Sequence, residues 1–303
     1  MNESNAVSAQ ARAATLAYLA AMVMLGTLGV FIHEVGLDTL TTVFFRCVFG
    51  ALALAAFCIW KRLFARANFR CRNVALAVFS GVLMVLNWVT FFEGIARVGI
   101  SVATIVFHVQ PFLVLLMGAS LFREKITADK FAWVGVGFGG LLLACGLDMG
   151  GAPANSSYAI GIVCTLTGAL AYSGVTLTTK SMRSMPPHLT ALIHCLVGIV
   201  ALAAFITIPV AGIGARQWSW LVGLGLLPTA LAYVLIYGAL PKMKTTSIAV
   251  LTFIYPAAAV GFDFLVYGHL LGIVQLGGLA LIVLAGLGVN LNWRWRFAAV
   301  ART

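Results

Sequence analysis

Charged residues are scarce in this sequence. Only 9% of its 303 residues are charged, while 62% are hydrophobic, and an ordinary soluble domain has about 25% charged residues. So little charge excludes a soluble globular fold. The apolar runs are continuous rather than alternating, which also excludes the strands of a membrane β-barrel.

Motifs for catalysis, metal binding and disulfide formation are also missing. The sequence has no H-E-x-x-H, no G-x-S-x-G and no Asp-rich metal motif, and its titratable groups are scattered over different apolar runs. The six cysteines show no C-x-x-C spacing. We therefore expect no enzyme activity, no metal site, no cofactor and no disulfide framework.

What the sequence does contain is ten apolar runs of roughly 20 residues, the length that crosses a bilayer as a helix. They are residues 13–32, 40–60, 73–93, 100–122, 129–147, 158–180, 188–210, 218–240, 246–267 and 270–292. The first run is longer than the apolar part of a usual secretory signal, so we interpret it as a retained span. The sequence predicts an all-α integral membrane protein with ten transmembrane helices.

The positive charges indicate the orientation. With both termini in the cytoplasm, 16 of the 19 basic residues fall in tails and cytoplasmic loops, while Arg97 and Arg216 fall in outward loops and Arg46 in a span. This is the positive-inside bias of membrane proteins. The net charge of +11 is therefore explained by basic residues in cytoplasmic loops and tails. We expect membrane lipid rather than nucleic acid as a partner.

The chain contains an internal repeat. RCVFGALALAAF (46–57) and HCLVGIVALAAF (194–205) are identical at seven of twelve positions, and aligning TIVFHVQPFLVL (104–115) with AVLTFIYPAAAV (249–260) superimposes Pro111 on Pro256. The halves are residues 1–150 and 151–303. Because five spans per half is an odd number, the second half is inverted, as in many secondary transporters.

Polar residues are concentrated in a few spans and predict a central cavity. Ser101, Thr104, His108 and Pro111 follow one helical stripe, and polar groups at membrane depth face the protein interior. We predict that the cavity binds substrate through ten residues: Asn87, Trp88, Phe91, Thr104, His108, Tyr172, Thr176, Tyr233, Tyr237 and Phe253. His108 is either a neutral hydrogen-bonding group or a proton carrier.

The two matched prolines interrupt helical hydrogen bonding near the bilayer centre. A proline at 111 or 256 frees the carbonyl of Phe107 or Thr252, and such a defect is tolerated where the backbone lines water or protein. We predict that Pro111 and Pro256 act as hinges for gating, with a plain packing kink as the alternative.

Arg46 and Asp263 are charges within predicted spans. A charge at this depth needs a partner, so we predict a structural ion pair between them, ahead of a site for a substrate carboxylate. Glu93 and Glu34 are the rival partners for Arg46.

The expected cargo follows from the charges that are missing at mid-membrane. No carboxylate lies there, which disfavours strongly cationic drugs, and no lysine or arginine lies there either, which disfavours sugar phosphates and nucleotides. A neutral or zwitterionic cargo remains, such as an aromatic or aliphatic amino acid.

Glycines of the fifth and tenth spans (Gly135, Gly139, Gly277, Gly278) are expected to give close packing within one chain, so we expect a monomer.

The duplicated five-span halves, with Arg46, the mid-span prolines and Glu124 in SLFREKIT, resemble the drug/metabolite transporter superfamily of the EamA type. Within it the chain looks like the bacterial aromatic amino-acid exporters. The resemblance implies a basket-like ten-helix fold in the inner membrane, a cavity lined by helices 1, 3, 4, 6, 8 and 9, and export of amino acids or similar metabolites. The sequence departs from the pattern at His269 and His194, which align with Glu124 and Arg46.

Overall fold

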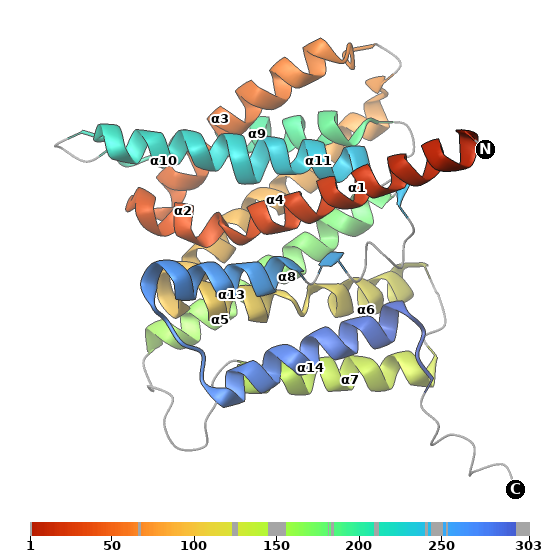
Figure 1. Ribbon diagram of the computed structural model, residues 1–303. Coiled ribbons are helices and arrows are strands. Elements are labelled where there is room, and N and C mark those ends of the chain that lie inside the picture. The colour runs from red at the N-terminus through yellow and green to blue at the C-terminus, as the bar shows by residue number, and fades with distance from the viewer. Residues whose placement is uncertain are drawn as a thin grey trace, which may run out of the picture.

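The computed structural model describes residues 2–65, 68–122, 127–144, 156–180, 182, 185–208, 212–239, 242–243, 251–252 and 254–294. In these residues the secondary structure is helical, and no strand occurs in them (Figure 1). The helices in chain order are α1 (Asn2–Gly26), α2 (Leu28–Val35), α3 (Thr39–Trp60), α4 (Cys71–Val98), α5 (Ile100–Phe107), α6 (Gln110–Phe122), α7 (Ala128–Ala144), α8 (Ser156–Lys180), α9 (Pro187–Leu202), α10 (Ala215–Gly225), the π-helix η2 (Leu226–Leu231), α11 (Ala232–Ala239), α13 (Ile254–Tyr267) and α14 (Ile273–Asn290).

Each of the ten predicted apolar runs coincides with a helix or with consecutive helices in the described residues. Six of these segments are at least 18 residues long and apolar enough to cross a membrane, and α9, α13 and α14 are shorter apolar helices. The all-helical membrane fold is therefore confirmed, while ten crossings stay a prediction. The start of α1 and the end of α14 lie on the same side of the molecule (Figure 1).

Local sequence explains where several helices begin and end. The Asp38 carboxylate accepts a hydrogen bond from the Thr41 backbone N–H at 3.0 Å and caps α3. Gly36 ends α2 at φ 59°, a left-handed conformation that favours glycine, and Gly99 separates α4 from α5 at φ 83°. Pro187 begins α9, where its missing N–H leaves no helical bond unmade.

Helices from the two halves of the chain pack against each other in matched pairs. α3 packs on α9, and α7 packs on α14 at one edge of the bundle (Figure 1). The contact of α4 with α8 has its counterpart in that of α11 with α1, and the contact of α6 with α8 has its counterpart in that of α13 with α1. Each of these helix contacts therefore has an equivalent contact between the corresponding helices of the two halves.

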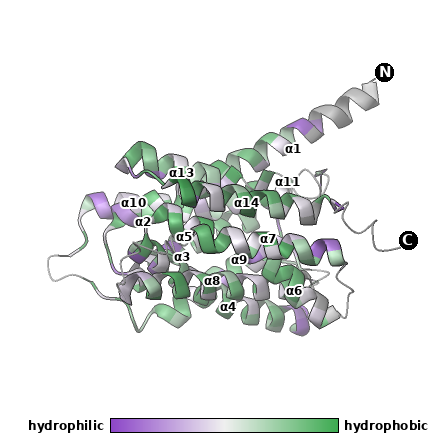
Figure 2. Ribbon diagram, turned by 90° about the horizontal axis from the view of Figure 1, so that it is seen from below, coloured by the Kyte–Doolittle hydropathy of each residue, from purple (hydrophilic) through white to green (hydrophobic). Residues whose placement is uncertain are grey.

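Many large apolar side chains point outward. Leu16 in α1, Val200 in α9 and Leu265 in α13 are 65%, 81% and 76% exposed. Hydrophobic residues run along the helices, and hydrophilic ones gather mainly near the helix ends (Figure 2). This distribution suits helices surrounded by acyl chains, because hydrocarbon offers polar groups no hydrogen-bond partners.

The glycines of α7 and α14 differ from expectation. A Cβ atom at Gly135, Gly139 or Gly277 would meet nothing within 4 Å, so the prediction of close packing at these three positions is wrong. The close approach occurs instead at Gly140, where a Cβ atom would lie 2.8 Å from the carbonyl oxygen of Gly278. The two neighbouring glycines Gly139 and Gly140 point in different directions because one residue turns a helix by about 100°.

The exposed thiol of Cys71 at the start of α4 offers a test of the predicted orientation. If the loop before α4 is cytoplasmic, a membrane-impermeant maleimide should label Cys71 in inside-out vesicles and leave it unlabelled in intact cells. The measurement is a gel shift of the purified protein, and the Cys71→Ser variant should remove the band. Labelling in intact cells would reverse the orientation.

Candidate functional site

The bundle encloses a central cavity of about 200 Å³. It is lined by Tyr18, Met22, Leu25, Leu28, Arg46, Asn87, Trp88, Phe91, Phe107, His108, Gln110, Pro111, Tyr172, Tyr233, Ile236, Thr252 and Tyr255. These residues come from α1 through α6, α8, α11, α13 and the segment before α13. Both halves of the chain therefore build the wall, and most of it is aromatic or aliphatic.

Most of the predicted binding residues lie on this wall. They are Asn87, Trp88, Phe91, His108, Tyr172 and Tyr233, and the predicted hinge Pro111 lines the cavity with them. Thr104 is buried behind the wall, and Phe253 lies outside the described residues. Their role in binding a substrate stays a prediction.

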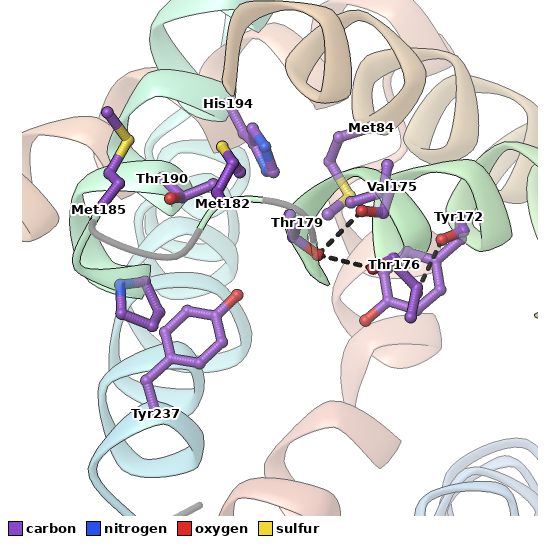
Figure 3. Close-up of a pocket in the computed structure, with 11 residues that line it drawn as sticks. Met84, Tyr172, Val175, Thr176, Thr179, Met182, Met185, Thr190, His194 and Tyr237 are labelled. Carbon is purple, nitrogen blue, oxygen red and sulfur yellow. Dashed lines mark hydrogen bonds between the residues drawn. The ribbon is translucent and has the colours of Figure 1, made fainter. Parts of the chain in front are cut away.

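A second cavity, of about 460 Å³, contains the other two predicted residues, Thr176 and Tyr237 (Figure 3). Tyr172 lines both cavities, so they are neighbours. Met182 and Met185, from the segment between α8 and α9, also line the second cavity. The sequence analysis predicts that this segment is cytoplasmic, so the second cavity lies beside a predicted cytoplasmic loop.

Two threonine hydroxyl groups of α8 line the second cavity, and both donate hydrogen bonds to backbone carbonyl oxygens of their own helix. Thr179 Oγ1 donates to the carbonyl oxygens of Val175 at 2.9 Å and Thr176 at 3.0 Å, and Thr176 Oγ1 donates to the Tyr172 carbonyl oxygen at 2.9 Å (Figure 3). A hydroxyl bonded in this way still has oxygen lone pairs to offer. The wall of the second cavity therefore presents hydrogen-bond acceptors and apolar surface.

The predicted fourth span is broken in two beside the cavity. α5 ends at Phe107 and α6 begins at Gln110, so Pro111 is the second residue of a new helix, where its ring fits without strain. His108 fills the break, and its Nδ1 donates to the Thr104 carbonyl oxygen at 2.7 Å. Pro256 lies in α13 and is buried. Pro111 thus marks a helix start rather than a bend within a continuous helix.

Among the described residues, Arg46 does not pair with a carboxylate. Its Nε donates to Thr229 Oγ1 at 2.8 Å, and its guanidinium carbon lies 4.7 Å from the ring centroid of Trp88 and 5.2 Å from that of Phe92. The side chain is only 2% exposed. Arg46 lines the central cavity, so the cavity wall includes one arginine that was not among the predicted binding residues.

Asp263 is bonded elsewhere, so the predicted Arg46–Asp263 ion pair is wrong. One Asp263 oxygen accepts from the Ser101 backbone N–H at 3.2 Å and from Ser101 Oγ at 2.5 Å, and the other accepts from His269 Nδ1 at 2.9 Å. The physical reason is that the N-terminus of α5 offers hydrogen-bond donors to this carboxylate, because the free N–H groups of a helix N-terminus favour anions.

The rival partners of Arg46 are also bonded elsewhere. Glu34 accepts from Arg216 and from the Tyr267 hydroxyl at 3.1 Å. Glu93 accepts from Arg97 at 2.8 Å and from Thr39 Oγ1 at 2.8 Å. All three candidate carboxylates are therefore bonded to other groups, and no ion pair joins Arg46 to a carboxylate in the part of the chain that the structure describes.

The partner that Arg46 does have belongs to a π-helix. Thr229 lies in η2, where its hydroxyl donates to the Leu224 carbonyl oxygen at 2.8 Å and accepts from Arg46. Pro228, just before it, has no backbone N–H to give to a regular helix. Short π-helices are rare and occur frequently at functional sites.

The resemblance implied that the first and ninth helices line the cavity, but the residues through which they do so were not among the predicted binding residues. Tyr18, Met22 and Leu25 line the cavity from α1, and Thr252 and Tyr255 line it from the other half of the chain. Tyr18 and Thr252 are joined by a hydrogen bond of 2.8 Å between their hydroxyls. The signal was present, because Tyr18 interrupts an otherwise apolar first span.

Relatives of the chain are transporters. It is 27% identical over 285 residues to the uncharacterized transporter YxxF of Bacillus subtilis, covering 94% of this chain and 91% of that protein. It is 27% identical over 274 residues to an uncharacterized transporter of Archaeoglobus fulgidus, covering 90% and 93%. It is 24% identical over 255 residues to the pseudopaline exporter CntI of Pseudomonas aeruginosa, covering 82% and 84%.

A protein solved by crystallography shares the fold with a TM-score of 0.66 at 17% identity, covering 91% of this chain and 95% of that one. Two segments of the chain, residues 12–146 and 159–291, match the EamA-like transporter family. These matches cover most of the sequence and agree with the helices and the cavity described above. The chain therefore belongs to the EamA-like transporter family, and it is a multi-pass inner-membrane transporter rather than an enzyme.

Proposed function

We propose that this transporter exports amino acids, aromatic or neutral, and similar small metabolites. The observation that carries the proposal is the lining of the central cavity, which combines aromatic rings with polar groups and includes no carboxylate among the described residues. Rings of this kind bind an apolar side chain by burial and stacking, while a few polar groups fix its orientation. One relative, CntI, is named an exporter, which supports the direction of transport.

The proposed mechanism is alternating access by two inverted five-helix repeats, residues 1–150 and 151–303, acting as a monomer. The matched packing of helices from the two halves supports it, since such repeats rock against each other around a site at their interface. The break between α5 and α6 supports a hinge at Pro111, and we propose the same role for Pro256 in α13.

Purified protein in liposomes should carry out saturable flux of phenylalanine, tryptophan, methionine or threonine. Trp88→Ala and Tyr233→Ala should each reduce this flux at least about tenfold, because each removes an aromatic wall worth roughly 1.5 kcal/mol or more. The measurement is uptake of radiolabelled amino acid with and without a pH gradient. Leu265→Ala, which alters a lipid-exposed side chain of α13, is the matched control and should transport normally.

Export of lipophilic drugs is the second candidate, and the largely apolar cavity wall favours it. Absence of amino-acid flux together with ethidium or chloramphenicol flux would replace the first proposal by the second. Flux that ignores the pH gradient would identify a facilitator rather than a proton antiporter.

A further inference from the structure

Two polar atoms of the central cavity residues lack hydrogen-bond partners. Arg46 Nη1 and Asn87 Oδ1 are buried, and neither bonds to any described group. The first is a charged donor and the second is an acceptor, and both side chains line the same cavity. Unpaired buried polar groups are rare in proteins, because each costs about 1–3 kcal/mol, and more for a charged group.

The surroundings hold Arg46 in place without neutralising it. Its Nε is bonded to Thr229, and its guanidinium lies over Trp88 and Phe92. These contacts fix the plane of the guanidinium and add no negative charge to it. No ion pair joins Arg46 to a carboxylate in the described residues, and the three predicted candidates, Glu34, Glu93 and Asp263, are bonded to other groups.

We propose that Arg46 is the carboxylate-binding residue of the transport site and that Asn87 Oδ1 accepts a hydrogen bond from the amino group of the same substrate. This inference rests on the proposed function and names the chemistry of its substrate. Arginine donates to a carboxylate through its planar fork, and such charge-assisted bonds are about twice as strong as neutral ones. The aromatic side chains of the cavity then receive the apolar part of the substrate.

The cavity favours a carboxylate over a phosphate monoester. A phosphate group carries about two negative charges at neutral pH, and Arg46 is the one cationic side chain among the described residues of the cavity wall. A carboxylate carries a single charge, which this guanidinium balances. In a substrate with one carboxylate and one amino group, the carboxylate pairs with Arg46 Nη1 and the amino group pairs with Asn87 Oδ1.

The test is ligand-induced thermal stabilisation of the purified full-length protein in detergent. The probes share a ring and differ in charge: phenylalanine, phenylpropionate without the amino group, and phenethylamine without the carboxylate. Wild type should be stabilised most by phenylalanine, then by phenylpropionate, and not by phenethylamine. Arg46→Lys and Arg46→Gln should weaken binding of phenylalanine and phenylpropionate at least about tenfold, because a hydrogen bond to a charged group is lost.

Two further variants separate a binding role from a structural one. Arg97→Gln removes an arginine that is paired with Glu93 and lies outside the cavity wall, and it should bind all probes as wild type does. Asn87→Asp places a carboxylate in the same cavity as Arg46; it should abolish the phenylpropionate response without lowering the melting temperature of the free protein. It keeps the proposal testable should both Arg46 variants fail to fold.

The outcomes distinguish this proposal from the proposed function. Phenylpropionate could stabilise wild type but not Arg46→Gln, while the liposomes show no amino-acid flux. This result would support the arginine site and reject amino-acid export. Equal stabilisation by phenethylamine and phenylpropionate, or an unchanged carboxylate response in Arg46→Gln or Asn87→Asp, would overturn the arginine site. Amino-acid flux that survives in Arg46→Gln with an unchanged Michaelis constant would overturn the arginine site and leave amino-acid export standing.

Discussion

Replacing Asp263 by alanine should lower the free energy of unfolding by about 3 kcal/mol, because two buried donors at the start of α5 lose their acceptor. Asp263 is 2% exposed and receives the Ser101 backbone N–H and hydroxyl, so it ties α13 to the N-terminus of α5. The measurement is equilibrium unfolding by SDS in mixed micelles, monitored by circular dichroism. α5 places Phe107 on the cavity wall, so transport should fall as well.

Two control variants identify which interaction of Asp263 matters. His269→Ala removes the other hydrogen-bond partner, but the His269 side chain is 66% exposed, and a pair with a solvent-exposed member contributes about 0–1 kcal/mol. Asp263→Asn keeps a carbonyl oxygen for the Ser101 N–H and should lose less stability than Asp263→Ala. A loss in His269→Ala as large as in Asp263→Ala would show that the bond to His269, rather than the bonds to Ser101, holds these helices.

The fold could be predicted well from the sequence because the bilayer imposes a simple rule on it. Backbone groups in hydrocarbon must bond within their own segment, so a long apolar run becomes a helix. Each of the ten predicted runs contains helical structure in the described residues. Breaks within runs were harder to place, as in the fourth span, where the helix ends at Phe107 rather than bending at Pro111.

The cavity could be predicted in part, because helical spacing shows which residues share a face but not which helices meet. Asn87, Trp88 and His108 were placed on its wall, whereas Tyr18 and Leu25 were missed because their helix is otherwise apolar. The pairing of Arg46 failed for a related reason. The Thr229 hydroxyl accepts from Arg46, and the Ser101 hydroxyl and N–H donate to Asp263, so uncharged groups satisfy both charges, and a search for opposite charges in the sequence overlooks them.

Gly225→Ala should be as damaging as the loss of Asp263, because it separates α3 from the π-helix that holds Arg46. A Cβ atom at Gly225 would lie 2.4 Å from the Cβ of Phe49 and 3.0 Å from the backbone nitrogen of Gly50. Backbone atoms cannot rotate away, so the helices must move apart, and overpacking of this kind costs about 1–3 kcal/mol. Transport should fall too, because the displacement lengthens the 2.8 Å bond between Arg46 Nε and Thr229.

Gly238 in α11 provides the matched control, since it belongs to the same predicted span and a Cβ atom there would meet nothing within 4 Å. Gly238→Ala should be neutral or stabilise the protein by up to about 1 kcal/mol, because alanine favours the helix more than glycine does. The same substitution should therefore have opposite signs at two positions of one span, measured as the fraction of folded protein after heating in detergent. Equal stability of the two variants would contradict the close contact between α3 and the end of α10, and with it the geometry that fixes Arg46 at the cavity wall.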